Sequence, residues 1–261
     1  MMSSKPVTII TGAARGIGQS CAIALANAGF NLLINDLPDK ESREKLSQVK
    51  TELEMSGAEV ECFCADIADI TLHEVLLDII EKRWGRFDCL VNNAGITVKK
   101  RGDLLDITPE SFDRNIQVNT RAPFFLSQAF SRRLIKQKED PRQHRSIIFI
   151  TSINAVMLAM NRGEYTLAKT ASSASVKLFA TRLSPLSIGV YEVRPGLIKT
   201  DMTIPATQYY DQLIAKGLVP QGRWGEPEDV ASTVRAMAEG KLRYTCGLSV
   251  LIDGGLSMPR F

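Results

Sequence analysis

Short, nearly continuous apolar runs alternate along the chain with longer segments in which apolar residues follow a helical period. Seven such runs are predicted to form strands: Val7–Thr11, Leu32–Ile34, Glu59–Ala65, Cys89–Val91, Ser146–Thr151, Gly189–Val193 and Leu248–Ile252. A strand with one solvent-facing side would alternate apolar and polar residues, and these runs do not. They are typical of strands covered on both faces, as in a parallel sheet.

Helices are predicted between the strands, and two of them carry N-terminal signals. The predicted helices are Gly16–Ala28, Lys40–Ser56, one beginning at Thr71–Glu74, a long one beginning at Thr108–Glu110, Gly163–Leu183 and Pro227–Glu239. Thr71 and Glu74 fit a capping box, and Pro109 follows the N-cap candidate Thr108. This alternation predicts an α/β fold: one doubly wound domain over residues 1–261, with helices on both faces of a seven-stranded parallel sheet.

Two segments interrupt the alternation. Gln137–Arg145 is rich in charge and is predicted to be a surface loop. Thr200–Gly222 lies between the sixth strand and the last helix and contains two prolines. Ligands of doubly wound folds bind beyond the carboxyl ends of the strands. We therefore interpret residues 200–222 as a substrate lid, with an ordinary surface excursion as the alternative.

The composition is that of an ordinary globular protein and narrows the classes of function. Hydrophobic residues make up 44% of the 261 positions and charged residues 23%, so a large core can form without disulfides or a metal. The net charge of +3 is too small to indicate nucleic acid or an anionic membrane as a partner. The basic cluster Lys99–Arg101 is short, and we interpret it as a solvated loop.

The cysteines and histidines do not indicate a metal site. The five cysteines are scattered without zinc-ligand spacing and are interpreted as buried thiols in a reducing compartment: Cys21, Cys62, Cys64, Cys89 and Cys246. His73 lies at a charged helix start and His144 in the charged loop, so histidine-based catalysis is not expected. Residues 1–6 are too short for a signal peptide and no apolar run is long enough to span a membrane, so we expect a cytoplasmic protein.

A glycine-rich turn joins the first strand to the first helix. Thr11–Gly18 reads TGAARGIG, with Gly12, Gly16 and Gly18 available for a tight turn and the close approach of a pyrophosphate. The N-terminus of the following helix supplies unpaired N–H groups and partial positive charge. The turn therefore predicts a dinucleotide site.

Two residues bear on the choice between NAD and NADP, and they disagree. Asp36 ends the second strand, where a carboxylate accepts hydrogen bonds from the adenosine ribose and repels a 2′-phosphate. Arg15 offers a guanidinium to such a phosphate. Because Arg15 can turn into solvent whereas a carboxylate beside a phosphate is repelled directly, we favour NAD and keep NADP as the alternative.

Polar residues also follow the third and fourth strands. Asp66 is placed to bond the adenine or, equally well, to cap a turn. Asn92–Gly95 reads NNAG, and its small residues Ala94 and Gly95, beside Asn93, let backbone approach a cofactor. The alternative for NNAG is a plain turn.

Tyr165 and Lys169 lie four residues apart in YTLAK and share one face of a predicted helix. A free tyrosine has a pKa of about 10 and exchanges protons poorly at neutral pH. A neighbouring ammonium favours the phenolate, so Lys169 is predicted to lower the pKa of Tyr165. Ser152, at the end of the fifth strand, is a candidate to bond the substrate oxygen. Asn119, or Asn115 one turn earlier, is a candidate polar residue within a helix.

Together these segments resemble the short-chain dehydrogenase/reductase family, in its subgroup of about 250-residue members. The resemblance covers essentially the whole chain and rests on TGAARGIG (Thr11–Gly18), NNAG (Asn92–Gly95), Asn119 in QVNTRAP, Ser152 in ITS, YTLAK (Tyr165–Lys169) and RPG (Arg194–Gly196). It implies a Rossmann-type fold and hydride transfer between a nicotinamide dinucleotide and a ketone or secondary alcohol. It also implies a homotetramer, with Gly247–Gly255 as an interface strand.

The resemblance implies a role for each matched residue. Tyr165 would exchange a proton with the substrate oxygen, and Ser152 would position the carbonyl. Lys169 would hold the nicotinamide ribose, and Asn119 would hold a water that links Lys169 to solvent. The implied cofactor-binding residues are Gly12, Arg15, Gly16, Ile17, Gly18, Asp36, Asp66, Ile67, Asn93, Ala94, Gly95, Tyr165, Lys169, Pro195, Gly196, Ile198 and Thr200. No metal ligand is expected.

The approach to the tyrosine departs from the family pattern. Met157–Glu164 reads MLAMNRGE, where relatives commonly carry a smaller segment rich in Pro or Gly. Arg162 and Glu164 can therefore fall near the substrate, and we hypothesise that Arg162 pairs with a carboxylate or phosphate on it. Exposure to solvent is the alternative for Arg162.

Several functions share these motifs. The nearest likeness is to 3-oxoacyl-thioester reductases, and an NADPH-dependent 3-oxoacyl-[acyl-carrier-protein] reductase is the main alternative to an NAD-linked dehydrogenase. Sugar, polyol and hydroxysteroid dehydrogenases carry the same motifs. A dinucleotide-sensing protein without turnover is a third interpretation, but such a protein has no need to keep Asn119, Ser152 and the Tyr165–Lys169 pair together.

Overall fold

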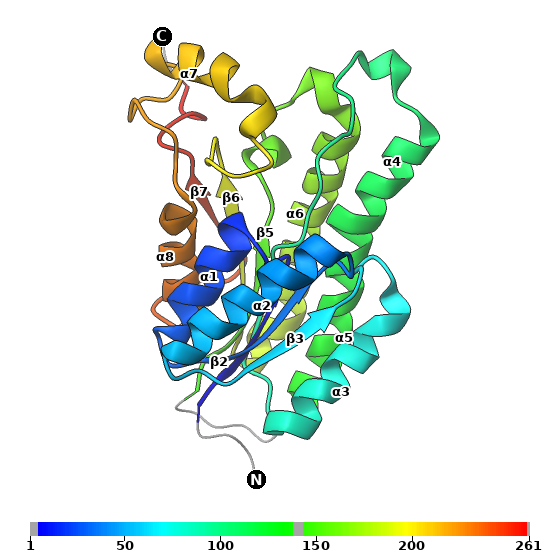
Figure 1. The fold of residues 1–261 in the computed structure, drawn as a ribbon, viewed down its shortest axis with the longest axis vertical. Helices are drawn as coiled ribbons and strands as arrows, with labels where there is room; N and C mark the ends of the chain where they lie inside the picture. Colours follow the sequence, from blue (N-terminus) through cyan, green and yellow to red (C-terminus); the bar gives the residue numbers. More distant parts are fainter. Residues whose placement is uncertain (1–4, 138–142, 260–261) are drawn as a thin grey trace.

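The sheet is built around β1 (Val7–Thr11), whose five residues are all buried. The computed structural model describes residues 5–137 and 143–259. The other strands are β2 (Asn31–Asp36), β3 (Val60–Cys64), β4 (Cys89–Asn92), β5 (Arg145–Ile150), β6 (Ile188–Pro195) and β7 (Leu248–Ile252). Every pairing is parallel, in the order β3-β2-β1-β4-β5-β6-β7. The predicted seven-stranded parallel sheet is confirmed (Figure 1).

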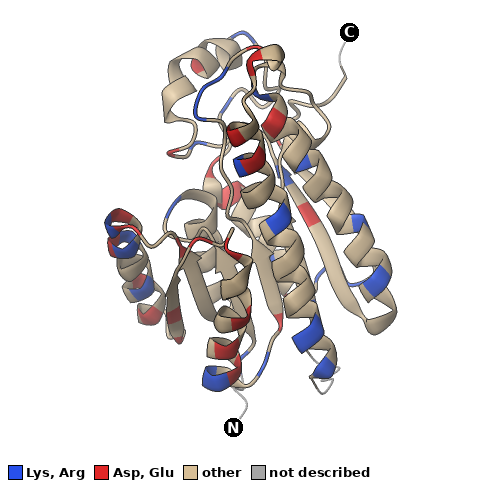
Figure 2. Ribbon diagram, turned by 90° about the vertical axis from the view of Figure 1, so that its right-hand side faces the viewer, with Lys and Arg blue, Asp and Glu red and all other residues tan. Residues whose placement is uncertain are grey.

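Helices cover both faces of the sheet. They are α1 (Gly16–Ala26), α2 (Lys40–Met55), α3 (His73–Trp84), α4 (Pro109–Ile116), α5 (Ala122–Lys136), α6 (Gly163–Leu183), α7 (Thr207–Ala215) and α8 (Pro227–Ala238). One apolar cluster joins the sheet to α1, α2 and α8, and a second joins the opposite face to α3, α5 and α6. Lys, Arg, Asp and Glu lie mainly on the helices and loops rather than in the sheet, as the coloured ribbon shows (Figure 2).

Local capping explains where two helices begin. Thr108 accepts a hydrogen bond from the Ser111 N–H at 3.3 Å, and Pro109 occupies the first turn of α4, as predicted. The capping box predicted at Thr71 is wrong. Asp69 instead accepts the Thr71 N–H at 3.0 Å and starts a short 3₁₀ turn, from which α3 continues at His73. The Thr71 hydroxyl donates to the same Asp69 carboxylate at 2.6 Å, and α3 has no side-chain cap at its first N–H groups.

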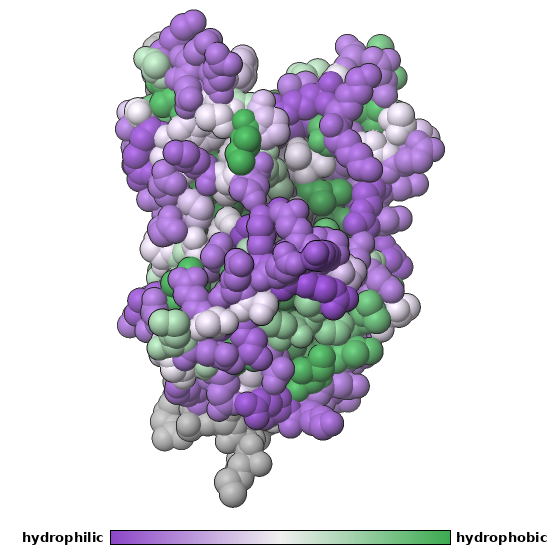
Figure 3. Space-filling view, viewed as in Figure 1, coloured by the Kyte–Doolittle hydropathy of each residue, from purple (hydrophilic) through white to green (hydrophobic). Residues whose placement is uncertain are grey.

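The carboxyl ends of the strands meet at one edge, where the strand order reverses between β1 and β4. From β1 the chain adds strands outward to β3 and then returns to place β4 on the other side. Such a reversal leaves a crevice beyond the strand ends. The space-filling view shows a hollow at this edge, between the part that carries α7 and the part that carries α4 (Figure 3).

Further predictions concern the cysteines, the two charged loops and membrane-spanning helices. Cys21 and Cys89 are buried, and burial raises the pKa of the Cys89 thiol to about 11, but Cys246 is exposed, so the prediction of five buried thiols is wrong. Lys99–Arg101 is exposed, as a solvated loop predicts. Of the predicted charged loop, residues 138–142 lie outside the described residues. No helix among the described residues is long and apolar enough to cross a membrane.

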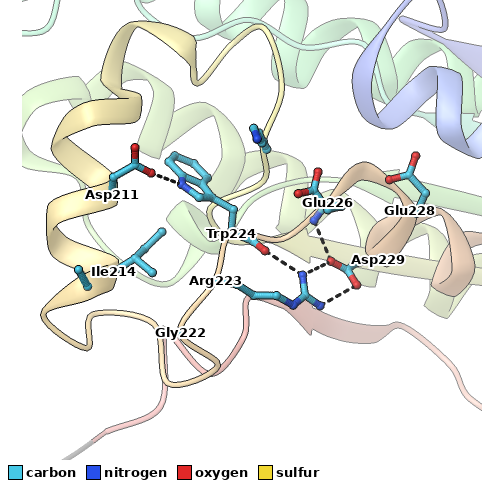
Figure 4. A pocket seen from close by; sticks show the side chains of 10 residues that line it. Asp211, Ile214, Gly222, Arg223, Trp224, Glu226, Glu228 and Asp229 are labelled. Carbon is cyan, nitrogen blue, oxygen red and sulfur yellow. Dashed lines mark hydrogen bonds and ion pairs between the residues drawn. The ribbon is translucent and has the colours of Figure 1, made fainter.

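The segment interpreted as a lid contains a helix that the sequence did not indicate. Residues 200–222 include a 3₁₀ turn and α7. The Trp224 indole N–H donates to Asp211 of α7 at 2.7 Å, and the Arg223 guanidinium pairs with Asp229 of α8 at 2.7 Å. These contacts line a shallow cavity of about 810 Å³ behind α7 (Figure 4). The segment is therefore fastened at its C-terminal end to the body of the protein.

A buried ion pair at the opposite edge of the sheet gives a stability prediction. Arg86 and Asp88 are both buried and form two hydrogen bonds at 2.6 and 2.8 Å, and Asp88 also accepts the Val7 N–H. We expect Asp88→Ala to lower the free energy of unfolding by about 3–5 kcal/mol, because it leaves a buried guanidinium without its carboxylate. Urea unfolding measures the loss.

The matched control removes an exposed carboxylate. Asp78 is one of three acidic partners of Arg133 at the surface, so Asp78→Ala is expected to cost less than about 1 kcal/mol. Equal losses of unfolding free energy in the two variants would show that the buried pair contributes no more to stability than the exposed one.

Candidate active site

The glycine turn and the NNAG segment lock together at the ends of β1 and β4. Thr11 Oγ1 accepts the N–H groups of Asn93 and Ala94 at 3.1 and 3.0 Å, and Asn93 Nδ2 donates to the Gly12 carbonyl at 2.9 Å. A Cβ at Gly18 would collide with that same carbonyl oxygen. The turn therefore requires glycine to bring the N-terminus of α1 against the strand ends, where its N–H groups are placed to hold a pyrophosphate.

A cleft of about 530 Å³ opens above this turn. Its walls contain every predicted cofactor residue and Ser152: Gly12, Arg15, Gly16, Ile17, Gly18, Asp36, Asp66, Ile67, Asn93, Ala94, Gly95, Ser152, Tyr165, Lys169, Pro195, Gly196, Ile198 and Thr200. Asn119 lies outside these walls, and so do Arg162 and Glu164, which we hypothesised to fall near the substrate. Residues from six strand ends thus converge on a single crevice, and the cradle of small residues fits a dinucleotide.

Asp36 and Arg15 both line the cleft, but Asp36 contacts only backbone N–H groups, whereas Arg15 lies near two carboxylates. Asp36 accepts the Ala14 N–H at 2.9 Å and the Leu37 N–H at 2.8 Å, which leaves lone pairs on both of its oxygens for further donors. The Arg15 guanidinium lies 3.5 Å from Glu41 and 3.7 Å from Asp201. Carboxylates therefore flank the cation that would attract a 2′-phosphate.

Asp66 caps a turn, one of the two roles considered for it, and its role toward the adenine stays a prediction. It lines the cleft, and it also caps a turn by accepting the Ala68 N–H at 2.9 Å. Arg114 of α4 pairs with Asp66 at 2.8 Å and lines the same wall. Sequence reasoning missed Arg114, because nothing in its local pattern distinguishes it from a solvated helix position.

Tyr165, Lys169 and Ser152 form one buried group at the other end of the cleft. The Lys169 ammonium lies 5.8 Å from the centroid of the Tyr165 ring and donates to the Ile150 carbonyl at 3.1 Å. The Ser152 hydroxyl accepts the Asn154 N–H at 3.1 Å, and it lies close enough to Tyr165 to oppose the rise in the pKa of that phenol. The phenol and the ammonium thus face the same space, as their spacing in α6 predicts.

The electrostatics of this group correct one prediction. Burial raises the pKa of Tyr165 above its ordinary value, and the groups that oppose this rise are Ser152 and Arg162 rather than Lys169. Burial also lowers the pKa of Lys169 to about 8, with the Glu192 charge opposing it. The prediction that Lys169 lowers the pKa of Tyr165 is therefore wrong for the protein alone, because desolvation of the phenol dominates.

Asn119 lies behind the cleft wall rather than in it. It sits in a π-helical turn, Gln117–Arg121, between α4 and α5, and such turns often accompany functional sites. Its side chain bonds both the N–H and the carbonyl of Ile96, at 3.1 and 3.0 Å. A Cβ at Gly95 would lie 2.9 Å from Asn119 Oδ1 and 3.3 Å from Lys169 Nζ. Asn119 therefore holds the backbone that separates it from Lys169.

A buried carboxylate behind the catalytic group was also missed. Glu192 in β6 is completely buried and accepts hydrogen bonds from Thr151 at 2.6 Å, Ser173 at 3.1 Å and Arg194 at 2.9 Å, and from Ser249. Burial opposes its charge, but these donors lower the pKa of Glu192 below its ordinary value.

The partners of Glu192 come from three elements around the catalytic group. Thr151 precedes Ser152, and Ser173 lies one helical turn after Lys169. Glu192 therefore ties the end of β5 to α6. The signal was present in the sequence: Glu192 and Arg194 are two residues apart within an apolar strand, so they share one face of the sheet.

Known proteins resemble this chain over nearly its whole length. A family model described as enoyl-(acyl carrier protein) reductase matches residues 12–257. The chain is 32% identical over 256 residues to a 3-oxoacyl-[acyl-carrier-protein] reductase of Synechocystis sp., covering 97% of each chain. It is 31% identical over 252 residues to a 2-dehydro-3-deoxy-D-gluconate 5-dehydrogenase of Dickeya dadantii, covering 95% of this chain and 94% of that protein.

Solved structures match over nearly the whole chain. A 3-oxoacyl-[acyl-carrier protein] reductase from Brucella melitensis in complex with NAD has a TM-score of 0.93 and 40% identity, covering 99% of this chain and all (100%) of that one. A short-chain type dehydrogenase/reductase from Mycobacterium marinum has a TM-score of 0.87 and 28% identity, covering 99% and 97% of the two chains. The chain therefore belongs to the short-chain dehydrogenase/reductase family and is an oxidoreductase that acts on a ketone or secondary alcohol with a nicotinamide dinucleotide.

Proposed function

We propose that this enzyme uses NAD and that Tyr165 exchanges the proton while hydride passes between the cofactor and the substrate carbon. One observation carries the proposal: the Tyr165 phenol, the Ser152 hydroxyl and the Lys169 ammonium line the same cleft as the glycine turn. A catalytic group within reach of both a dinucleotide cradle and an open cleft is what proton-coupled hydride transfer requires.

The cofactor-binding roles follow from the donors and acceptors in the cleft. The N-terminus of α1 would hold the pyrophosphate, and Asp36 would accept hydrogen bonds from the adenosine ribose. Lys169 would donate to the nicotinamide ribose, since its ammonium keeps two donor positions beyond the Ile150 carbonyl. When bound, the nicotinamide ring supplies the hydride acceptor or donor.

Tyr165 supplies the proton. Because burial raises its pKa, the phenol is protonated at neutral pH and can donate to the oxygen of a ketone as the carbon gains a hydride. In alcohol oxidation the same oxygen takes the proton back. Ser152 would donate a hydrogen bond to the substrate oxygen and hold it against the phenol.

Lys169 and Asn119 support the reacting group in different ways. Ser152 and Arg162 are the groups that favour the negative charge left on the phenol oxygen after proton transfer, whereas Lys169 would act through the nicotinamide ribose that it holds. Asn119 holds Ile96 and, with it, the backbone at Gly95 that packs over Lys169. A water beside Asn119 would carry protons between Lys169 and solvent.

The preference for NAD rests on charge. Asp36 faces the cleft, whereas Arg15 is flanked by Glu41 and Asp201. A 2′-phosphate would meet a carboxylate at Asp36 and a guanidinium whose charge is already balanced. The NAD complex of the Brucella melitensis relative supports the same choice.

An NADPH-linked 3-oxoacyl-[acyl-carrier-protein] reductase is the second candidate. The names of similar proteins favour its 3-oxoacyl substrate but not its NADPH, and the exposed apolar side chains of Val156, Leu158 and Met160 before α6 favour the same substrate. An acyl chain could cover these side chains. Asp36 is the observation against it, because of its repulsion of a 2′-phosphate.

Two larger features complete the proposal. We assign residues 200–222 as a lid over a single catalytic domain, since Thr200–Thr203 lines the cleft while α7 is fastened beyond it. A homotetramer is supported by apolar side chains left exposed on the outer sheet edge and on the helices, among them Leu251 of β7 and Leu178 of α6.

Removing the phenol hydroxyl tests the central role. Tyr165→Phe is expected to lower kcat by roughly 10²–10⁴-fold, the usual contribution of a general acid, while NADH binding measured by fluorescence stays unchanged. The control is Tyr191→Phe, since Tyr191 is also buried but bonds Leu242 away from the cleft. Full activity in Tyr165→Phe is the result that contradicts the mechanism.

The acidity of Lys169 predicts a pH profile. Its folded-state pKa is lowered to about 8, so its charge is present below that pH and lost above it. We expect kcat/KM for ketone reduction to be level near pH 7 and to fall as the pH rises through about 8. The residual activity of Lys169→Arg should lack this fall, because a guanidinium stays charged.

The control for the profile is Lys177→Met, an exposed lysine two turns further along α6, which should keep the wild-type profile. A level profile between about pH 7 and about pH 9 would rule out a titrating Lys169.

Asp36→Asn tests the cofactor preference. Loss of the carboxylate removes a charged acceptor for the ribose and the repulsion of a 2′-phosphate. The ratio of kcat/KM with NADH to that with NADPH should fall by about tenfold or more. Asp39→Asn, which alters only the cap of α2, should keep the ratio. If wild type favours NADPH, the assignment of NAD is wrong.

A further inference from the structure

Arg162 lies beside the reacting phenol. It ends a 3₁₀ turn just before α6 and is three residues before Tyr165, so the two side chains share a face. The guanidinium carbon is 5.3 Å from the centroid of the Tyr165 ring. A permanent positive charge therefore stands next to the group that meets the substrate oxygen.

Nothing among the described residues balances this charge. No carboxylate of residues 5–137 and 143–259 forms an ion pair with Arg162, and its Nε is buried without an acceptor. Glu164 is buried nearby, but it accepts the Ser111 hydroxyl of α4 at 2.7 Å. An unsatisfied buried donor costs free energy, so an acceptor arriving from outside would be favoured.

Two other arginines show the contrast. The buried Arg86 pairs with Asp88 at 2.6 Å just before β4, and the partly buried Arg194 of β6 pairs with Glu192 at 2.9 Å. The Nε of Arg194 is buried without an acceptor, as is that of Arg162, but the Arg194 guanidinium reaches a carboxylate. Arg162 forms no such ion pair among the residues that the structure describes.

A basic loop reinforces the charge of Arg162. The Gly102 N–H donates to the Asn161 carbonyl at 3.2 Å, and Leu104 packs where a Cβ at Gly163 would lie. These contacts place Lys99–Arg101 on the exposed loop next to Arg162. Asp103 and Asp106 follow in the same loop and offset part of this charge, but neither pairs with Arg162. A local excess of positive charge raises the concentration of anions at the entrance.

We propose that Arg162 binds an oxyanion of the substrate, so that the enzyme acts on carbonyl compounds or alcohols that carry a carboxylate or phosphate a short spacer from the reacting carbon. The inference rests on the proposed function, which puts the substrate oxygen at Tyr165. Arginine suits this role because its planar fork holds both oxygens of a carboxylate or two of a phosphate.

The competing explanation is that Arg162 only makes Tyr165 more acidic. Its charge does act in that direction. An effect on the phenol, however, is the same for every substrate, whereas a contact with an anion separates an acid from its neutral counterpart. The comparison of matched acids and esters therefore isolates the proposed contact.

The experiment measures binding without turnover. Isothermal titration of the enzyme saturated with the oxidised dinucleotide, which cannot reduce a ketone, gives the Kd of acetoacetate, 4-oxopentanoate and 5-oxohexanoate and of their methyl esters. Dihydroxyacetone phosphate and dihydroxyacetone form the phosphate arm. The proteins are wild type, Arg162→Gln, Arg162→Lys and Arg182→Gln, the last an exposed arginine at the far end of α6.

We expect at least one anion to bind wild type about tenfold more tightly than its neutral counterpart, the usual strength of a charge-assisted hydrogen bond. Arg162→Gln should reduce this preference below about threefold, Arg162→Lys should keep part of it, and Arg182→Gln should keep all of it. The arm that shows the preference identifies carboxylate or phosphate.

Each other outcome is decisive. Equal binding of every pair by wild type, no binding of any anion, or a preference that survives in Arg162→Gln overturns the proposal. Turnover assays separate it from the proposed function: reduction of neutral ketones alone would leave hydride transfer standing and remove the role of Arg162. Selective binding of anions without turnover of any compound would leave the anion contact of Arg162 standing and remove hydride transfer.

Discussion

The arrangement of the active site depends on keeping one lysine ammonium charged inside the protein. Lys169 is almost completely buried, and burial alone favours its neutral form. The Ile150 carbonyl accepts a hydrogen bond from it, and the Glu192 carboxylate supplies the opposing charge at a distance. A Cβ at Gly95 would lie 2.9 Å from Asn119 Oδ1 and 3.3 Å from the ammonium, so a side chain there would crowd both groups. The ends of β4 and β5, Glu192 of β6 and the π-helical turn therefore all pack around the Lys169 ammonium or act on its charge, and they shape this part of the cleft.

The pKa of Tyr165 shifts in the direction opposite to the one that its nearness to Lys169 predicts. A cation one helical turn away is expected to make a phenol acidic, yet desolvation of the phenol outweighs it and the pKa rises. The protein alone therefore presents a proton donor. An oxidised nicotinamide bound in the cleft would oppose this rise with its positive charge.

Sequence patterns predicted the architecture because they are local and ordered. Continuous apolar runs, the glycine turn and YTLAK each follow from neighbours in the chain, and a parallel sheet then gathers the strand ends by itself. Interactions between distant segments were out of reach. Asp69, rather than Thr71, caps the turn that leads into α3. A short sequence motif does not show which of two neighbouring polar side chains will act as the cap. The Glu192 contacts with β5, α6 and β7, and the π-helical turn that aims Asn119 at Ile96, depend on tertiary packing. The sign of the pKa shift at Tyr165 required knowing its burial.

The arginines around the cleft lie in two different electrostatic surroundings. Near the glycine turn, Arg15 is flanked by Glu41 and Asp201, and Arg114 is paired with Asp66. Because the cations there are balanced, a dinucleotide would be held by backbone donors rather than by excess charge, and an extra phosphate would gain little. Arg162 lies beside Tyr165 rather than among the residues that line the cleft, and it has no such partner among the described residues. Because unbalanced charge at a partly buried position is costly, a ligand that reaches past Tyr165 to Arg162 would supply the missing counter-charge.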